Sequence, residues 1–248
     1  MIPQNYNTAF FQLQQSQSYR SAKTILPLIN EWVKPASVID IGCGVGAWLK
    51  VFKEFNVQKI TGLDGDYVDI ENLLIEKKEF IVADLESRVA VDSRYDLVMC
   101  LEVAEHLSAN RAESFVADLC KLGDIILFSA AVPGQEGTLH INEQYPGYWI
   151  DRFKNNDFEC IDCIRPAIWK NTEIEFWYKQ NIMLFVNKQQ INNYAFLKTL
   201  PSYFGNSIIH PALFDYKTGK SDNYKKILNN PFRVAYYYLR NVFNLFKK

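Results

Sequence analysis

Several features that would place this chain in a special class of protein are missing from its sequence. No apolar run reaches the roughly 18 residues that a membrane-spanning helix needs. The first seven residues lack a basic stretch followed by an apolar core, so secretion is not predicted either. The formal net charge is only −1, which gives no overall attraction to nucleic acid. We therefore expect a cytoplasmic protein.

Cysteine is also scarce. The five cysteines are an odd number scattered along the chain, and Cys160-x-x-Cys163 has no second such pair, so neither a zinc ribbon nor a disulfide framework is predicted. The 248 residues are 48% hydrophobic and 15% aromatic, which is enough to bury a full core. We predict one main domain over residues 1–190 and an extension over 191–248.

The most informative stretch runs from Val38 to Trp48. A β-branched strand leads into Asp40, and Gly42, Gly44 and Gly46 follow before a helix. Glycines at alternate positions let the backbone turn sharply, and a ligand can then approach amide groups at the helix N-terminus. The spacing differs from the dinucleotide fingerprint G-x-G-x-x-G, because the acid lies inside the motif. These residues predict a nucleotide-cofactor site.

Acids also close the next two predicted strands. Asp64 ends the run 59–63, about twenty residues past the glycines, where a carboxylate can accept hydrogen bonds from ribose hydroxyls. Asp84 ends the run 79–83, and Leu101 follows the run 95–100. The carboxyl ends of parallel strands meet at one sheet edge, which is where ligands bind in such folds.

The segment D-I-G-C-G-V-G, residues 40–46, resembles motif I of the class I S-adenosylmethionine (SAM) methyltransferases. The resemblance covers about residues 20–187 and implies SAM as the cofactor. It implies that Asp84 reaches the adenine amino group and that Leu101 lies beside the methyl donor. Arg20, in a lead-in helix, is a candidate partner for the methionine carboxylate. The predicted cofactor-binding residues are therefore Asp40, Gly42, Gly44, Gly46, Asp64, Asp84, Leu101 and Arg20.

Strands and helices alternate through this half of the chain. Helices are predicted at 21–33, 45–55, 66–76, 110–122 and 145–155, and further strands at 124–130, 158–164 and 181–186. This order predicts an α/β fold with a Rossmann-like, mostly parallel sheet and helices on both faces. The resembled family has seven strands, of which the last is antiparallel.

The segment Glu102-Val-Ala-Glu105-His106 follows the fourth predicted strand. On one helical turn, residues 102, 105 and 106 would converge on one side, and His140 lies on the loop after the fifth strand. Two carboxylates and two imidazoles suit a divalent cation such as Mg²⁺ or Mn²⁺. Two alternatives remain: His140 acts as a general base without a metal, or these residues are structural. Glu105, His106 and His140 are the candidate catalytic residues.

The E-x-x-E-H segment resembles the metal-binding segment of small-RNA terminal 2′-O-methyltransferases and of ubiquinone-pathway O-methyltransferases. The resemblance implies a cation that gathers vicinal hydroxyls of the acceptor. Residues 131–146 resemble methyltransferases found with bacterial surface-polysaccharide genes. We therefore predict O-methylation of a sugar hydroxyl in a nucleotide sugar or a capsular or surface glycan precursor. An RNA acceptor is disfavoured because no basic appendage can follow a phosphate backbone. A nicotinamide oxidoreductase, a metal-independent small-molecule methyltransferase and a non-catalytic SAM-binding partner subunit are the alternatives.

The chain changes character beyond about residue 188. Residues 192–223 lack periodicity and predict an irregular cap, in which His210 is either a further site histidine or a surface residue. Residues 230–248 predict a basic, aromatic helix that begins at Asn230 and Pro231. Such a helix can lie on an anionic membrane surface, or it can dock on its own domain or on a second copy in an oligomer.

Overall fold

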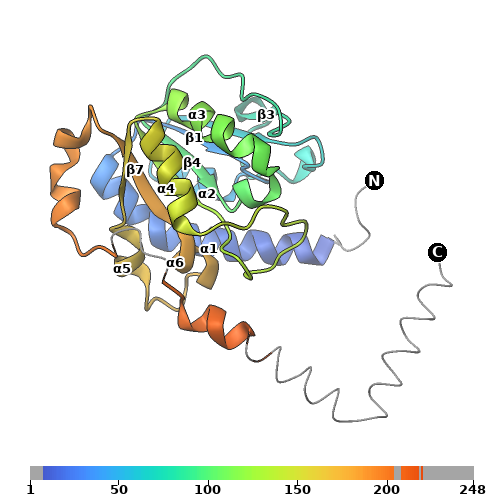
Figure 1. The fold of residues 1–248 in the computed structure, drawn as a ribbon. Coiled ribbons are helices and arrows are strands. Elements are labelled where there is room, and N and C mark those ends of the chain that lie inside the picture. Colours follow the sequence, from blue (N-terminus) through green and yellow to red (C-terminus); the bar gives the residue numbers. More distant parts are fainter. Residues whose placement is uncertain (1–7, 204–207, 218, 220–248) are drawn as a thin grey trace, which may run out of the picture. The chain divides into compact units, whose positions relative to one another are not determined.

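The computed structural model describes residues 8–203, 208–217 and 219, with side chains from residue 16 onward (Figure 1). Its centre is a seven-stranded sheet of order β3-β2-β1-β4-β5-β7-β6. β7 runs antiparallel to both of its neighbours, and the other pairs are parallel. The strands are β1 (Ser37–Ile41), β2 (Lys59–Asp64), β3 (Phe80–Val82), β4 (Leu97–Leu101), β5 (Ile125–Ser129), β6 (Phe158–Ile161) and β7 (Met183–Asn187). The predicted Rossmann-like, mostly parallel sheet is confirmed.

Helices cover both faces of this sheet (Figure 1). They are α1 (Thr8–Val33), α2 (Ala47–Glu54), α3 (Ala112–Leu122), α4 (Pro146–Asn155), α5 (Ile164–Ile168) and α6 (Phe176–Asn181). In β4, Leu97 and Met99 belong to an apolar cluster shared with α1, α2, α5 and α6. Val98 and Cys100 belong to a second cluster, shared with α3 and α4. Successive strand side chains point to opposite faces, so a strand that is covered on both faces, such as β4, needs apolar residues throughout.

The helix predicted at 66–76 is wrong. The segment holds only a short 3₁₀ turn at Ile70–Asn72, and a second one follows at Lys77–Glu79. Asp69 begins the first turn, where its carboxylate accepts hydrogen bonds from the Glu71 amide (3.0 Å) and the Asn72 side chain (2.7 Å). Ile75 is the one residue of this segment that is buried. Because the segment has no apolar face to pack, local side-chain hydrogen bonds decide its conformation.

The first helix is longer than predicted. It begins at Thr8 rather than near residue 21, and it continues through Pro27 to Val33. Its buried residues, among them Ile25, Leu26 and Ile29, pack against the sheet. The packing therefore outweighs the helix-breaking tendency of an internal proline.

The chain divides into two compact units, Met1–Ile208 and Ile209–Lys248. Residues Ile191–Thr199 form a kinked 3₁₀ segment of the first unit, in which Leu197 is buried. In the second unit, residues 211–217 are helical, and His210 Nδ1 accepts a hydrogen bond from the Ala212 amide at the start of this helix. The helix predicted at 230–248 lies outside the described residues. Within those that are described, no helix is long and apolar enough to cross a membrane.

Candidate active site

The glycine-rich loop joins β1 to α2. Gly42, Gly44 and Gly46 all have left-handed φ angles, of 80°, 54° and 83°. A Cβ on Gly42 would lie 2.3 Å from Val103 Cγ2, and one on Gly46 would lie 3.0 Å from Ile75. A Cβ on Gly44 would meet no atom within 4 Å. Packing thus excludes a Cβ at Gly42 and leaves little room for one at Gly46, whereas Gly44 leaves the loop open to a ligand.

Asp64, the last residue of β2, lies against this loop. Its carboxylate is only 4% exposed and accepts hydrogen bonds from the amides of Gly44 (2.6 Å) and Gly65 (2.7 Å). The Tyr67 hydroxyl donates to the same carboxylate. Burial and the Asp64 charge raise the pKa of Tyr67, so this hydroxyl keeps its proton. The structure therefore brings together the glycine loop and the acid predicted to bind ribose.

Asp40 lies in the middle of the sheet, where β1 is flanked by β2 and β4. Its side chain is buried, and burial together with the nearby Asp64 raises its pKa from the ordinary 3.8 to about 7. Ionising this group in the folded protein is thus unfavourable near and below neutral pH.

The raised pKa of Asp40 should make the free energy of unfolding depend on pH. Between about pH 4 and pH 7 the unfolded chain has lost this proton while the folded chain keeps it, so stability falls as pH rises, by at most about 1.4 kcal/mol per pH unit. Asp40→Asn removes this contribution to the pH dependence of stability. Urea unfolding should show that the stability of the variant relative to wild type increases from pH 4.5 to pH 7 and then levels off. A difference that is flat across this range would mean that Asp40 titrates normally.

The remaining predicted cofactor residues lie near the same sheet edge or on α1. Leu101 is buried at the end of β4. Asp84 is exposed after β3, where its oxygens accept from the Glu86 amide (3.0 Å) and the Ser87 hydroxyl (2.9 Å). Arg20 on α1 is half exposed and pairs with Glu175 (2.7 Å) at the start of α6. The cofactor contacts predicted for these three residues stay predictions.

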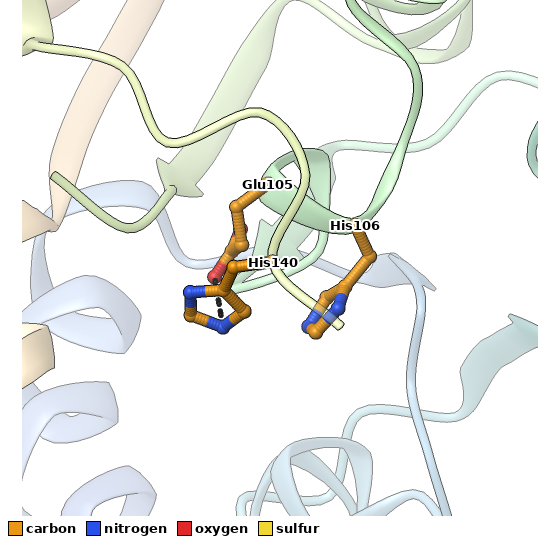
Figure 2. A group of neighbouring side chains, drawn as sticks. All are labelled: Glu105, His106 and His140. Carbon is orange, nitrogen blue, oxygen red and sulfur yellow. Dashed lines mark ion pairs between the residues drawn. The ribbon is translucent and has the colours of Figure 1, made fainter. Parts of the chain in front are cut away.

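Three of the four predicted metal ligands form a cluster beyond β4 and β5. Glu105 and His106 lie on the 3₁₀ turn Ala104–His106, and His140 lies on the loop between β5 and α4 (Figure 2). Each offers a ligand atom within 4.8 Å of the others. His140 Nε2 lies 4.0 Å from Glu105 Oε1, and the two imidazole rings meet edge to face with centroids 4.8 Å apart.

Glu105 has unusual electrostatics. Its side chain is fully buried, and neither carboxylate oxygen has a hydrogen-bond partner. Burial, reinforced by the charge of Glu102, raises the pKa of Glu105 well above its ordinary value. Desolvation of the ring and the adjacent His140 lower the pKa of His106, although the residue as a whole is exposed. A buried, unpartnered carboxylate needs a proton or a cation, and the adjacent imidazoles are suitable ligands.

The loop that carries His140 is held by contacts that the sequence does not reveal. Glu143 accepts from the amides of Gly134 (2.7 Å) and Glu136 (2.8 Å) and from His140 Nδ1 (3.0 Å). A Cβ on Gly137 would lie 2.1 Å from His140 Nε2, so the ring packs directly over that glycine. With Nδ1–H donating to Glu143, the Nε2 lone pair faces the cluster.

Glu102 does not join the cluster, and the single helical turn predicted for 102–106 is wrong. Glu102 has a left-handed φ of 56°, with its amide donating to the Ser129 carbonyl (3.0 Å). The left-handed backbone at Glu102 directs its side chain away from those of Glu105 and His106 on the following 3₁₀ turn. Its carboxylate instead accepts from the side-chain amides of Gln135 (2.8 Å) and Asn181 (3.1 Å). Burial raises the pKa of Glu102, and these amides oppose the rise.

Comparison with known proteins supplies the family. Residues 13–162 match the family model of a methyltransferase domain. The ubiquinone biosynthesis O-methyltransferase of Rickettsia akari is 30% identical over 100 residues, which are 37% of this chain and 38% of that protein. The chain spans 26% to 38% of the length of the curated relatives it matches.

Solved structures show the same fold. The methyltransferase domain of a bacterial Hen1 gives a TM-score of 0.51 at 18% identity, over 68% of this chain and 98% of that one. The magnesium protoporphyrin IX methyltransferase of Synechocystis PCC 6803 with bound SAM gives 0.52 at 17% identity, over 74% and 85%. The family match covers more than half of the chain, and the sheet order, the glycine loop and Asp64 agree with it. The chain therefore belongs to the methyltransferase-domain family.

Proposed function

We propose that this chain transfers the methyl group of SAM to a hydroxyl oxygen and that a divalent cation at Glu105, His106 and His140 assists the reaction. The observation that carries the proposal is the buried carboxylate of Glu105, which has no hydrogen-bond partner and lies beside two imidazoles. An aliphatic hydroxyl is a poor nucleophile at neutral pH unless a cation or a base lowers the cost of losing its proton.

The residues present fit the cofactor. The open face of Gly44 lets a ligand approach the loop amides, and the Asp64 carboxylate beside it suits ribose hydroxyls. Asp40, the residue before the last in β1, and Leu101, the last residue of the neighbouring β4, are our candidates for the rest of this side of the site. The chain's part is to hold SAM so that its methyl group faces the acceptor oxygen.

The residues of the cluster Glu105, His106 and His140 likewise fit a divalent cation. A carboxylate and two imidazoles suit Mn²⁺ better than Mg²⁺, which prefers an all-oxygen set. When bound, a cation supplies Lewis-acid stabilisation of negative charge on the acceptor oxygen. Glu143 orients His140 through Nδ1, and the Ile141 and Asn142 amides fix the turn by donating to the Glu105 carbonyl.

For the acceptor we propose a sugar that carries adjacent hydroxyls, within a nucleotide sugar or a glycan precursor. The support is the resemblance of residues 131–146, which hold Gln135, His140 and Glu143, to methyltransferases found with surface-polysaccharide genes. Transfer to oxygen is supported by two of the curated relatives, which are named as a ubiquinone biosynthesis O-methyltransferase and a probable tocopherol O-methyltransferase. The formal net charge of −1 gives no support to a nucleic-acid acceptor.

One observation favours a second candidate. The hydrogen bond between His140 Nδ1 and Glu143 is the arrangement in which a carboxylate orients a histidine base. In this candidate His140 Nε2 takes the acceptor proton directly and no cation is required.

The deciding experiment is calorimetric titration of SAM into chelator-treated protein, followed by methyl-transfer assays against a panel of sugar nucleotides with and without Mg²⁺ or Mn²⁺. SAM binding with turnover only after addition of metal supports the proposal. Turnover without metal selects His140 as base. SAM binding without turnover on any acceptor would favour a non-catalytic partner subunit, and no SAM binding would refute the cofactor assignment.

Glu143→Gln should weaken the acceptor side of the site alone. All three groups that reach Glu143 are donors, so the NH₂ of glutamine would face a donor at either carboxylate position, and the charged acceptor that orients the His140 ring would be lost. Losing such support of a ligand typically costs 10- to 100-fold, so we expect Mn²⁺ affinity and turnover to fall by about that factor. SAM affinity should not change. The control is Glu113→Gln, an exposed acid on α3. Unaltered Mn²⁺ affinity in Glu143→Gln would show that His140 needs no such support.

A further inference from the structure

The hydrogen-bonding capacity of Asp64 is almost used up by this chain's own groups. An ionised carboxylate accepts about four hydrogen bonds, two at each oxygen. Oδ1 accepts from the Gly65 amide and from the Tyr67 hydroxyl, and Oδ2 accepts from the Gly44 amide. One position, on Oδ2, is therefore left for a ligand. A ribose brings two adjacent hydroxyls, so one of the three existing donors must leave before both can bind.

Tyr67 is the donor that can leave. The Gly44 and Gly65 amides belong to the backbone and cannot withdraw without moving the loops. Tyr67 as a whole residue is 62% exposed, although its hydroxyl is partly buried against Asp64, and its ring reaches back over Gly65. A Cβ on Gly65 would lie 2.3 Å from the Tyr67 ring, so this fold-back requires glycine at that position. The ring can rotate into solvent with no loss of core packing.

We propose that Tyr67 is an exchange residue of the cofactor site. Its hydroxyl holds the position on Asp64 that one ribose hydroxyl takes when the adenosyl group binds. Before binding, Tyr67 keeps the Asp64 carboxylate oriented and satisfied. On binding, the phenol is released to water. This inference rests on the proposed SAM site and adds a residue to which the sequence analysis assigned no role.

The exchange has a consequence for selectivity. A ligand with both ribose hydroxyls must break the Tyr67–Asp64 hydrogen bond, whereas a ligand with one hydroxyl can use the remaining position on Oδ2. Tyr67 therefore opposes the binding of the complete ribose and leaves a monodeoxy ribose unaffected. The coupling between the tyrosine hydroxyl and one ligand hydroxyl can be measured as in a double-mutant cycle.

The test is calorimetry of the full chain with S-adenosylhomocysteine and with its 2′-deoxy and 3′-deoxy analogues, in wild type and Tyr67→Phe. Hydrogen bonds to charged groups are among the stronger ones, so we expect the phenylalanine variant to bind S-adenosylhomocysteine about tenfold more tightly. The gain should fall below about twofold for both deoxy analogues, because the exchange is no longer needed.

Tyr19→Phe is the matched control. The Tyr19 hydroxyl also donates to a carboxylate, Glu54 at 2.5 Å, but this pair links α1 to the C-terminal end of α2, away from the glycine loop. It should leave all three affinities unchanged. Equal or weaker binding of S-adenosylhomocysteine by Tyr67→Phe overturns the inference, as does an equal gain for the deoxy analogues. If wild type binds none of the three ligands, the proposed function fails as well, so the two failures are distinguishable.

Discussion

Glu105→Gln should reduce methyl transfer by about 10²- to 10³-fold and remove divalent-cation binding, while the protein stays folded and still binds SAM. A bound metal contributes several kcal/mol of charge stabilisation, and each 1.36 kcal/mol is a factor of ten in rate. Glutamine preserves the size and the neutral state that burial favours for Glu105. The substitution therefore removes the anionic ligand without leaving a cavity.

The pH dependence of cation binding gives a second readout. Because burial raises the pKa of Glu105, a proton competes with the cation at low pH, and Mn²⁺ affinity should rise with pH until that group ionises freely. In Glu105→Gln this dependence should disappear together with the binding. Isothermal titration with Mn²⁺ at several pH values measures both effects. The control is again Glu113→Gln on α3, which should behave like wild type.

A different result would discriminate between the two candidate functions. If Glu105→Gln keeps full turnover in the presence of chelator, no cation is involved and His140 acts as the base. Gly137→Ala then tests whether turnover needs the His140 ring in its present place. The new Cβ would displace the ring, whether the ring binds a cation or acts as the base.

The extent to which the sequence predicts this site depends on how local each signal is. Asp40, Gly42, Gly44, Gly46 and Asp64 come from strand ends and a turn that needs glycine, and the structure brings them together. Each of these signals is local, either a strand end or a turn of a few residues, so a single sequence reveals them.

Tertiary contacts decide the rest. The left-handed turn at Glu102 depends on its amide meeting Ser129 on the adjacent strand, and no spacing along the chain reveals this contact. The partners of Glu102 come from different elements, Gln135 from the loop after β5 and Asn181 from the end of α6. Glu143 lies three residues beyond His140, which alone does not identify it as the acceptor for that ring.

Gly42→Ala should destabilise the protein by about 2–5 kcal/mol. Placing alanine at a left-handed φ costs about 1–2 kcal/mol, and forcing a methyl group against packed neighbours adds about 1–3 kcal/mol. The new Cβ would lie 2.3 Å from Val103 Cγ2 and 2.9 Å from Cγ1, so the turn after β4 would have to move. Urea unfolding at constant pH measures the loss.

Gly44→Ala is the matched comparison, because its Cβ would meet nothing within 4 Å. Gly44→Ala should lower the free energy of unfolding only by the roughly 1–2 kcal/mol needed to place alanine at a left-handed φ. Its methyl group would occupy the open side of the loop, so SAM affinity rather than stability should fall. Adding Val103→Ala to Gly42→Ala should restore part of the lost stability, and the two substitutions should be non-additive.

The Gly42–Val103 contact also links the two halves of the site. Gly42 belongs to the loop proposed to hold the cofactor, and Val103 leads directly into the turn that carries Glu105 and His106. If Val103 moves to accommodate a methyl group at position 42, the acceptor cluster moves with it. Gly42→Ala should then lower Mn²⁺ affinity as well as stability, whereas Gly44→Ala should leave Mn²⁺ affinity unchanged. Equal Mn²⁺ binding in both variants would mean that the two half-sites are mechanically independent.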